Sequence, residues 1–214
     1  MKRFLCCLLV VLALPLAAAE TGGEREQDMS ASLARLQKEW AQIQYQMPED
    51  KKEDAFKALA DKAGILVEAF PDRAEPHVWQ GIILSTYAGA KGGLGALGLV
   101  KDARASLEEA IAIDPTALAG SAYTSLGSLY YQVPGWPLSF GDDEKAERYL
   151  KKALAINPDG IDANFFYGDF LLEQGEEKRA QVYLNKAVKA EPRAGREVAD
   201  AGRRDEARHL LDMI

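Results

Sequence analysis

The chain has 214 residues, of which 48% are hydrophobic and 28% charged, and its formal net charge is −7. This length suits one domain or one repeat array with a buried core. Nucleic acid is an improbable partner for so acidic a chain, because phosphate binding needs a stripe of Lys and Arg and the sequence has none.

Residues 1–19 have the features of a secretory signal peptide. Lys2 and Arg3 precede an unbroken apolar run, Phe4–Leu14. Ala17–Ala19 then supplies a small-x-small cleavage signal. The run is shorter than the roughly 20 residues of a membrane span, although an uncleaved N-terminal anchor is the alternative. We therefore expect export and no stable membrane span after cleavage.

The chain's two cysteines, Cys6 and Cys7, lie at the front of the apolar run. A lipidation cysteine would lie at the C-terminal end of this run, so we interpret both cysteines as apolar residues of the signal peptide. Cleavage removes them, which leaves no thiol, disulfide or cysteine metal site. Without Lys2 and Arg3 the 26 basic residues become 24 against 33 acidic ones, a net charge of −9. A thiol-free exported protein fits a bacterial periplasm.

Residues 20–70 precede the repeats and are expected to form a flexible leader followed by N-terminal helices. Residues 20–28 are polar and predict a flexible leader. The next stretch, to Pro48, is a helix with an apolar stripe at steps of three and four, formed by Leu33, Leu36, Trp40, Ile43 and Met47. This stripe favours a cap on the first repeat, and the alternative is a docking or oligomerisation helix. A second helix, residues 50–70, completes a degenerate half-repeat.

Three stretches share one pattern: Ala103–Pro115, Ala146–Pro158 and Ala180–Pro192. Each reads Ala, three residues, Leu, two residues, Ala, four residues, Pro. The spacing puts the apolar triplet on one helix face, and the small residues allow another helix to approach closely. The proline ends each helix because it lacks an N–H group.

A glycine precedes each stretch, and these are Gly81, Gly127 and Gly168. We interpret them as packing positions on the first helix of each unit. The third unit, with its 34-residue step from Pro158 to Pro192, resembles a tetratricopeptide repeat. The other two proline-to-proline steps are longer, which indicates insertions between the two helices. An ordinary helical bundle with alanine-rich interfaces is the alternative.

The first insertion, Gly89–Gly98, contains the pattern G-x-G-x-x-G from Gly93 to Gly98. In a dinucleotide-binding fold this pattern follows a strand. Here a helix precedes it, so we expect an extended helix–helix loop and no nucleotide or other cofactor.

The second insertion runs from Val133 to Phe140 and carries two large apolar residues, Trp136 and Phe140. They either fold back on the array or present a partner-binding surface. Asp142 and Asp143 follow at the start of the next helix, where carboxylates cap N–H groups. We favour capping over a calcium or magnesium site, because too few other oxygen ligands are nearby.

Catalysis has little support in the sequence. The only histidines, His77 and His209, lie far apart in the chain, and neither has a cysteine or acid at metal-ligand spacing. No serine occupies a G-x-S-x-G elbow. We therefore expect a protein that is not an enzyme and holds no metal.

The first helices of the repeats should line a concave groove. The residues two and three before each of the three glycines, and one after it, should point toward this groove. In the middle repeat they carry hydroxyl groups, and in the outer repeats they include Trp79 and Phe166, which would anchor a peptide or helix. The alternative is that both aromatics pack between helices. Counting from the glycines in this way selects Val78, Trp79 and Ile82, then Thr124, Ser125 and Ser128, then Phe165, Phe166 and Asp169, with Glu75, Ser121 and Asp162 one turn earlier. The candidate groove residues taken from these are Glu75, Trp79, Ile82, Ser121, Thr124, Ser125, Ser128, Asp162, Phe166 and Asp169.

The segment Pro137–Ala153, PLSFGDDEKAERYLKKA, resembles the T component of TRAP transporters. The resemblance extends from about Ala55 to the end of the chain. It implies degenerate tetratricopeptide repeats, trimers, and pairing with the transporter's periplasmic solute-binding protein. The chain lacks the lipobox cysteine of that family.

Together these features predict an all-α protein, an α-solenoid of about three repeats over residues 71–192, with N-terminal helices over residues 29–70 and a capping helix over residues 193–214. We expect a periplasmic, non-enzymatic scaffold that binds another protein or peptide. The alternative is an accessory protein that binds a small hydrophobic or organic solute. Self-association is a further expectation.

Overall fold

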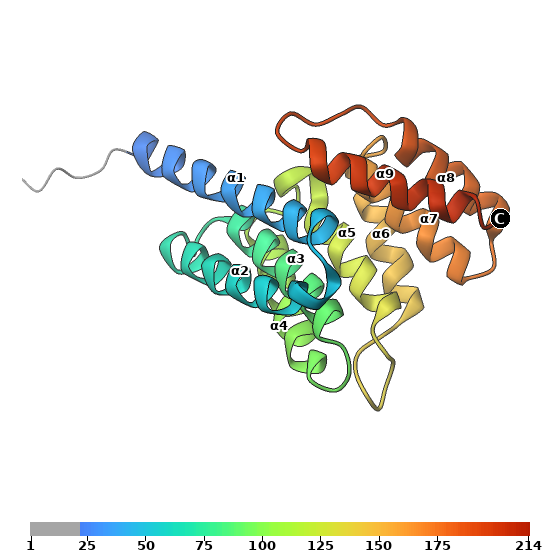
Figure 1. Cartoon of the computed structure of the whole chain (residues 1–214), viewed down its shortest axis with the longest axis horizontal. Helices are drawn as coiled ribbons and strands as arrows, with labels where there is room; N and C mark the ends of the chain where they lie inside the picture. Colours follow the sequence, from blue (N-terminus) through green and yellow to red (C-terminus); the bar gives the residue numbers. More distant parts are fainter. Residues whose placement is uncertain (1–21) are drawn as a thin grey trace, which may run out of the picture.

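The computed structural model describes residues 22–214, and the predicted signal peptide lies outside them. Over this range the chain is all-α (Figure 1), as expected. The helices are α1 Gly22–Gln46, α2 Glu49–Ala69, α3 Ala74–Lys91, α4 Ala96–Ile113, α5 Ala117–Gln132, α6 Asp143–Ile156, α7 Ile161–Glu173, α8 Glu177–Lys189 and α9 Glu197–Leu211.

Helices α3–α8 form three antiparallel pairs, α3/α4, α5/α6 and α7/α8, and each pair stacks on the next. In each pair the glycine of the first helix lies against the leucine of the second. A Cβ atom built on Gly81, Gly127 or Gly168 would approach Leu107, Leu150 or Leu184 to within 2.5–2.8 Å, closer than real contacts allow. We call these three contacts the repeat seams.

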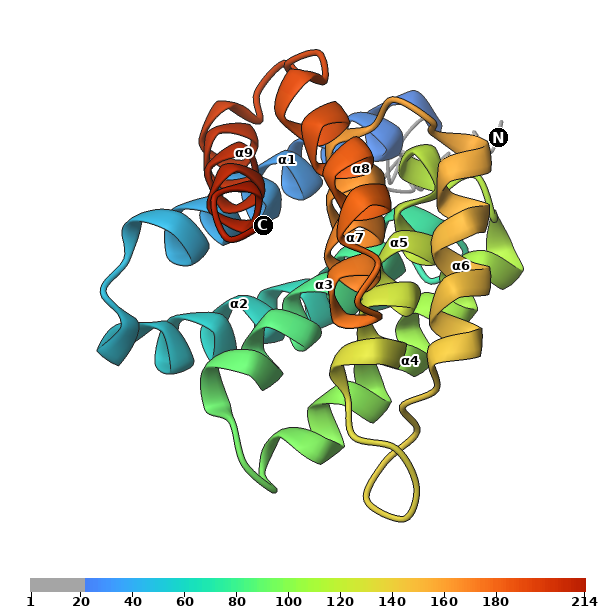
Figure 2. The same cartoon turned by 90° about the vertical axis from the view of Figure 1, so that its right-hand side faces the viewer.

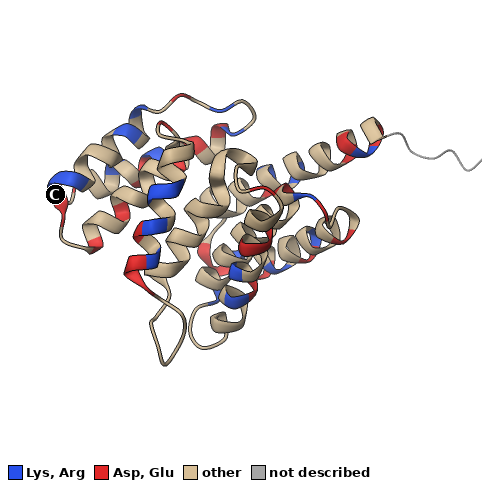
Figure 3. Cartoon of the chain, turned by 180° about the vertical axis from the view of Figure 1, so that it is seen from behind, with Lys and Arg blue, Asp and Glu red and all other residues tan. Residues whose placement is uncertain are grey.

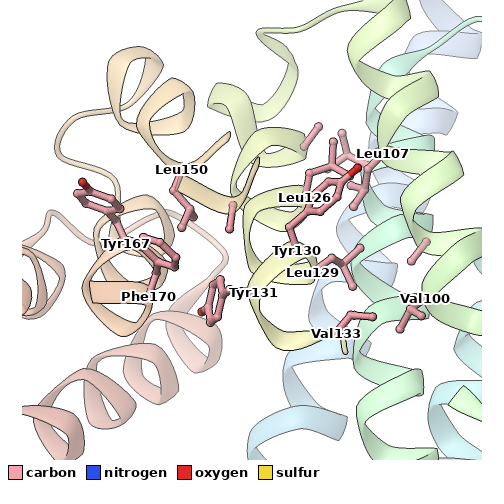
Figure 4. Packing of buried hydrophobic residues seen from close by; sticks show 14 of the residues in the cluster. Val100, Leu107, Leu126, Leu129, Tyr130, Tyr131, Val133, Leu150, Tyr167 and Phe170 are labelled. Atoms are coloured by element: carbon pink, nitrogen blue, oxygen red, sulfur yellow. The ribbon is translucent and has the colours of Figure 1, made fainter. Parts of the chain in front are cut away.

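The predicted alanine–leucine–alanine triplets are confirmed as the centre of the core. All nine side chains have no exposed surface. Figure 4 shows Leu107, Leu126 and Leu150 inside the cluster that joins the first two pairs to the third. Removing apolar area from water is the main favourable term in folding, so this cluster supplies much of the array's stability.

The N-terminal helices cap the first pair. Leu33, Leu36 and Ile43 of α1 are buried in one cluster with Phe56 of α2 and Trp79 of α3. The apolar stripe of α1 therefore packs inward, as the cap interpretation predicted, and it is not free for docking.

Two expectations about connections are wrong. The predicted leader is helical from Gly22, and Arg25 lies over the Phe70 ring while Glu26 pairs with Arg73. The segment Gly89–Gly98 is not an extended loop, because α3 continues to Lys91 and α4 begins at Ala96. Longer helices, joined by a short turn, absorb the first insertion.

The second repeat contains a left-handed turn near the start of α5. Leu118, Ala119 and Gly120 have φ values of 48°, 55° and 74°. The step from Pro115 to Gly127 is two residues longer than the equivalent steps from Pro71 to Gly81 and from Pro158 to Gly168. The turn accommodates the extra residues and keeps Gly127 in register with Leu150.

Helix α9 does more than cover the last repeat, since it reaches back to α1 as well as to α7 and α8 (Figure 2). Gly202 lies against the Tyr45 ring of α1, and the Tyr45 hydroxyl donates to Glu206 at 3.3 Å. The first and last described helices therefore touch, and the array is closed. We call the contacts of α9 and its preceding turn with α1 and α7 the closing seam.

Lys, Arg, Asp and Glu are spread along the helices seen in Figure 3, whereas residues 133–141 of the α5–α6 loop include none of them. In the described part of the chain, none of the helices combines the length and apolar character that a bilayer crossing requires.

Candidate functional site

A cavity of about 740 Å³ lies on the inner side of the closed array. Its walls come from the first helices of the pairs, α3, α5 and α7, and from α1, α2 and the α9 region. It reaches the surface where exposed Glu49, Gly89 and Gln132 line it. Its volume lies within the roughly 300–1,000 Å³ typical of small-molecule sites.

The structure brings most of the predicted groove residues to this cavity. The lining residues among them are Trp79, Ile82, Ser121, Thr124, Ser125, Ser128, Asp162 and Phe166. They come from three repeats, so only the stacking of the array gathers them. Their role in partner binding stays a prediction.

Glu75 and Asp169 do not line the cavity. Glu75 pairs with Arg73 at 3.0 Å. Asp169 accepts a hydrogen bond from the Tyr131 hydroxyl at 2.7 Å, and burial raises its pKa. Both side chains are thus engaged in other contacts.

Trp79 forms a wall of the cavity and is not a free anchor. Only 3% of its surface is exposed, and its ring packs edge-on against Trp40 with centroids 5.8 Å apart. The alternative of packing between helices therefore describes Trp79 better. Phe166 is only half-buried, and the Arg203 guanidinium lies 4.5 Å from its ring centre.

Several hydroxyl groups on the cavity wall donate their hydrogens to main-chain carbonyls. Ser121 donates to Leu118 at 2.6 Å, and Ser85 donates to Gly81 at 2.7 Å. Such hydroxyls retain lone pairs that can accept hydrogen bonds. Hydroxyl groups of α3 and α5 therefore make this part of the wall polar.

A network of charges lies where α7 meets α9. Asp162 accepts from Arg193 at 2.7 Å and from Arg203 at 3.1 Å. Arg193 also binds Asp200, which is 1% exposed, through its main-chain N–H and its side chain. Burial alone would raise the pKa of Asp162, but Arg203 and Arg193 hold it below its ordinary value.

The α5–α6 loop separates its two aromatics. Phe140 folds back, edge-on to Tyr130 at 5.4 Å and under the Arg104 guanidinium at 4.5 Å. Trp136 is 90% exposed. Of the two aromatics, Trp136 is therefore the one available for a partner. Asp142 caps α6 by accepting from the Lys145 main-chain N–H at 2.9 Å, as the capping interpretation predicted.

The glycine pattern and His77, which were considered as possible nucleotide or metal sites, have structural roles. Gly93 belongs to the short turn between α3 and α4, a helix-to-helix connection that lacks the strand of a dinucleotide-binding fold. The His77 ring contacts the Pro71 carbonyl at 3.0 Å. Across residues 22–214, no group of three His, Cys, Asp or Glu side chains is placed to hold a metal ion.

Sequence reasoning missed the contributions of the two ends of the chain to the cavity. Trp40 and Tyr45 come from α1, and Arg193, Arg196 and Arg203 come from the turn before α9 and from α9 itself. The seven-residue spacing of Arg196 and Arg203 was a signal that both lie on one side of this segment, with Arg196 at the N-cap of α9. Nothing in the periodicity indicated that this face turns back toward α1.

The comparisons with known proteins agree with this geometry. Residues 138–201 match the tetratricopeptide repeat family. The fold is similar to the crystal structure of a thermophilic TPR protein of Thermus thermophilus, with a TM-score of 0.57 and 16% identity over 88% of this chain and 91% of that one. A weaker similarity, to the crystal structure of MamA, has a TM-score of 0.45 and 23% identity over 78% and 92%. No curated protein matches the sequence. The first of these structures, together with the nine described helices, shows that the chain has the fold of a tetratricopeptide-repeat α-solenoid.

Proposed function

We propose that this chain is a periplasmic, non-enzymatic scaffold that binds another protein or peptide in its inner cavity. The observation that carries the proposal is the cavity itself, because the first helices of all three pairs supply its walls. Tetratricopeptide-repeat proteins generally bind partners on this inner surface. Export rests on the predicted signal peptide.

The solute-binding protein of a TRAP-type transporter is our candidate partner, on the resemblance of Pro137–Ala153 to the transporter's T component. Exposed Trp136 lies in the loop just before that segment and offers a second contact point outside the cavity. Large aromatic residues are favoured anchors at protein interfaces.

Filling the cavity tests the proposal. Ser125 is half-buried and lines the middle repeat, so Ser125→Arg introduces bulk and charge where a partner would bind. Periplasmic extract from the source organism would be passed over immobilised wild type and variants, and captured proteins identified by mass spectrometry. We expect a protein held by the wild type and by the surface control Lys151→Glu but lost from Ser125→Arg. Equal capture by all three would contradict a role for the cavity.

A second candidate function, binding of a small organic solute, is favoured by one observation. Contact between α9 and α1 bounds the cavity on one side, and its volume of about 740 Å³ is that of a small-molecule site. Pockets of this size bury small ligands well. Under this alternative the chain would hold a solute for delivery to a transport system.

A further inference from the structure

Arg196 differs from the other arginines at the closing seam. Arg193 and Arg203 are paired with carboxylates, and Arg204 donates to the Ala190 carbonyl at 2.9 Å. The Arg196 side chain makes no ion pair or hydrogen bond with any described residue, and its Nε is buried without an acceptor. Leaving a charged donor unsatisfied in this way is unfavourable, so the position calls for an explanation.

The Arg196 guanidinium lies against the cavity wall. Its central carbon is 4.9 Å from the Trp79 ring centre, and both residues line the cavity. Trp79 is itself held by Trp40, whose indole N–H donates to Thr86 at 3.1 Å. Stacking on a fixed ring orients the planar guanidinium, and an oriented guanidinium presents a fork that matches a carboxylate.

The surrounding charges favour a ligand with a single negative charge. Three neighbouring charges act electrostatically on the Arg196 guanidinium: Arg193 disfavours its positive charge, whereas Asp162 and Asp200 favour it, although neither carboxylate contacts it directly. A dianion such as phosphate would add two charges beside these carboxylates. A carboxylate adds one, opposite the guanidinium that has no partner.

The neighbouring walls favour an apolar group attached to that carboxylate. Ile82 and Phe166 line the same cavity and are half-buried, so each exposes apolar surface to an occupant. The exposed rim at Gly89 lies ten residues beyond Trp79 along α3, about 15 Å at the helical rise. A ligand that enters there can reach Arg196 while its apolar part remains against α3.

We propose that Arg196 is the anchor for a carboxylate on an apolar-tailed ligand in this cavity. The inference rests on the proposed function, because it names the chemistry that the cavity recognises. A free organic acid and the C-terminal carboxylate of a peptide share this chemistry. Arg196 is then kept unpaired because the ligand supplies its partner.

Titration calorimetry with matched probes tests the assignment on the protein spanning residues 20–214. The probes are 4-phenylbutyrate and its neutral amide, and the tetrapeptide Ala-Ala-Ala-Phe with a free or an amidated C-terminus. We expect at least one carboxylate probe to bind, and its amide to bind at least tenfold more weakly, because the charge-assisted hydrogen bonds are lost. Binding by the acid alone identifies a small solute, and binding by the peptide alone identifies a chain terminus.

Variants locate the anchor. Arg196→Gln should lower the affinity for the carboxylate probe at least tenfold and leave the affinity for the amide unchanged. Arg196→Lys should retain part of the affinity for the carboxylate. The control Arg208→Gln alters an exposed α9 arginine that pairs with Asp205 and should have no effect. Thermal melting of each variant shows whether it is folded, and we expect Arg196→Gln to be as stable as the wild type.

The inference is overturned if no carboxylate probe binds, or if Arg196→Gln binds the acid as tightly as the wild type does. The proposed function fails separately, when Ser125→Arg captures the same proteins as the wild type. Partner capture that survives Arg196→Gln, together with no carboxylate binding, would reject the anchor and retain the scaffold.

Discussion

The repeat seams and the closing seam join helices by different chemistry. At the repeat seams a glycine meets a fully buried leucine, and the flanking residues are alanines with no exposed surface. At the closing seam Asp162 and Asp200 hold two arginines, and a tyrosine hydroxyl reaches Glu206. The first kind of contact depends on shape and apolar area, whereas the second depends on carboxylate–arginine pairs. The cavity is lined by the first helices of the pairs and by the α9 region, so a change at either seam can alter its shape.

The largest effect is expected at the closing seam. Asp200→Ala removes a carboxylate that is 1% exposed and leaves Arg193 without its principal partner. Breaking one side of a buried pair is strongly destabilising, and we expect a loss of about 3 kcal/mol. Denaturant unfolding measures the loss, and hydrogen exchange should place it in α9 and the end of α1. Loss of protection throughout α3–α6 instead would mean that the two seams do not behave independently.

The repeat seams should respond to added volume. Gly168→Leu places a side chain where even a Cβ atom would lie 2.8 Å from Leu184, and we expect a loss of about 1–3 kcal/mol through overpacking. The exposed control Lys151→Leu should change stability much less. Equal melting temperatures for the two variants would show that the register assigned to the seam is wrong.

Acid should weaken the closing seam selectively. The pKa of Asp162 is lower in the folded protein than its ordinary value of 3.8, so its stabilising contribution is present above that value and is lost as the pH falls through the folded pKa. We expect α9 to lose protection first on acidification. Between pH 5 and about pH 3 the melting temperature of the variant Asp162→Asn should change less than that of the wild type. An equal change in both proteins would exclude Asp162 as the titrating group.

The smallest effect is expected from Tyr45→Phe, which removes only the hydroxyl group that donates to Glu206 at 3.3 Å. The ring remains against Gly202. A single partly exposed hydrogen bond contributes about 0.5–1 kcal/mol, so the expected loss in denaturant unfolding is within that range. A larger loss would show that α1 and α9 depend on this bond more than on the carboxylate–arginine network.

The sequence by itself determined the repeat architecture. The recurrence of Ala103, Leu107 and Ala110 in two later copies predicted which faces are buried, and Gly127 and Gly168 predicted where helices approach closely. These signals are local, because helical periodicity places residues three and four apart on one face whatever the rest of the chain does. The Asp142 cap was predictable for the same reason.

The tertiary structure decided the rest. Helical periodicity carries no measure of how far the superhelix curves, so the return of α9 to α1 could not be predicted from any single helix. The glycines between Gly89 and Gly98 suggested a loop, yet most of the insertion is helical, because packing of α3 against α4 outweighs the weak helix propensity of glycine. The pairing of Arg193 and Arg203 with Asp162, and the isolation of Arg196 over Trp79, depend on segments more than 30 residues apart in the chain. Contacts between such distant segments have no periodic signature, and only the folded array brings them together.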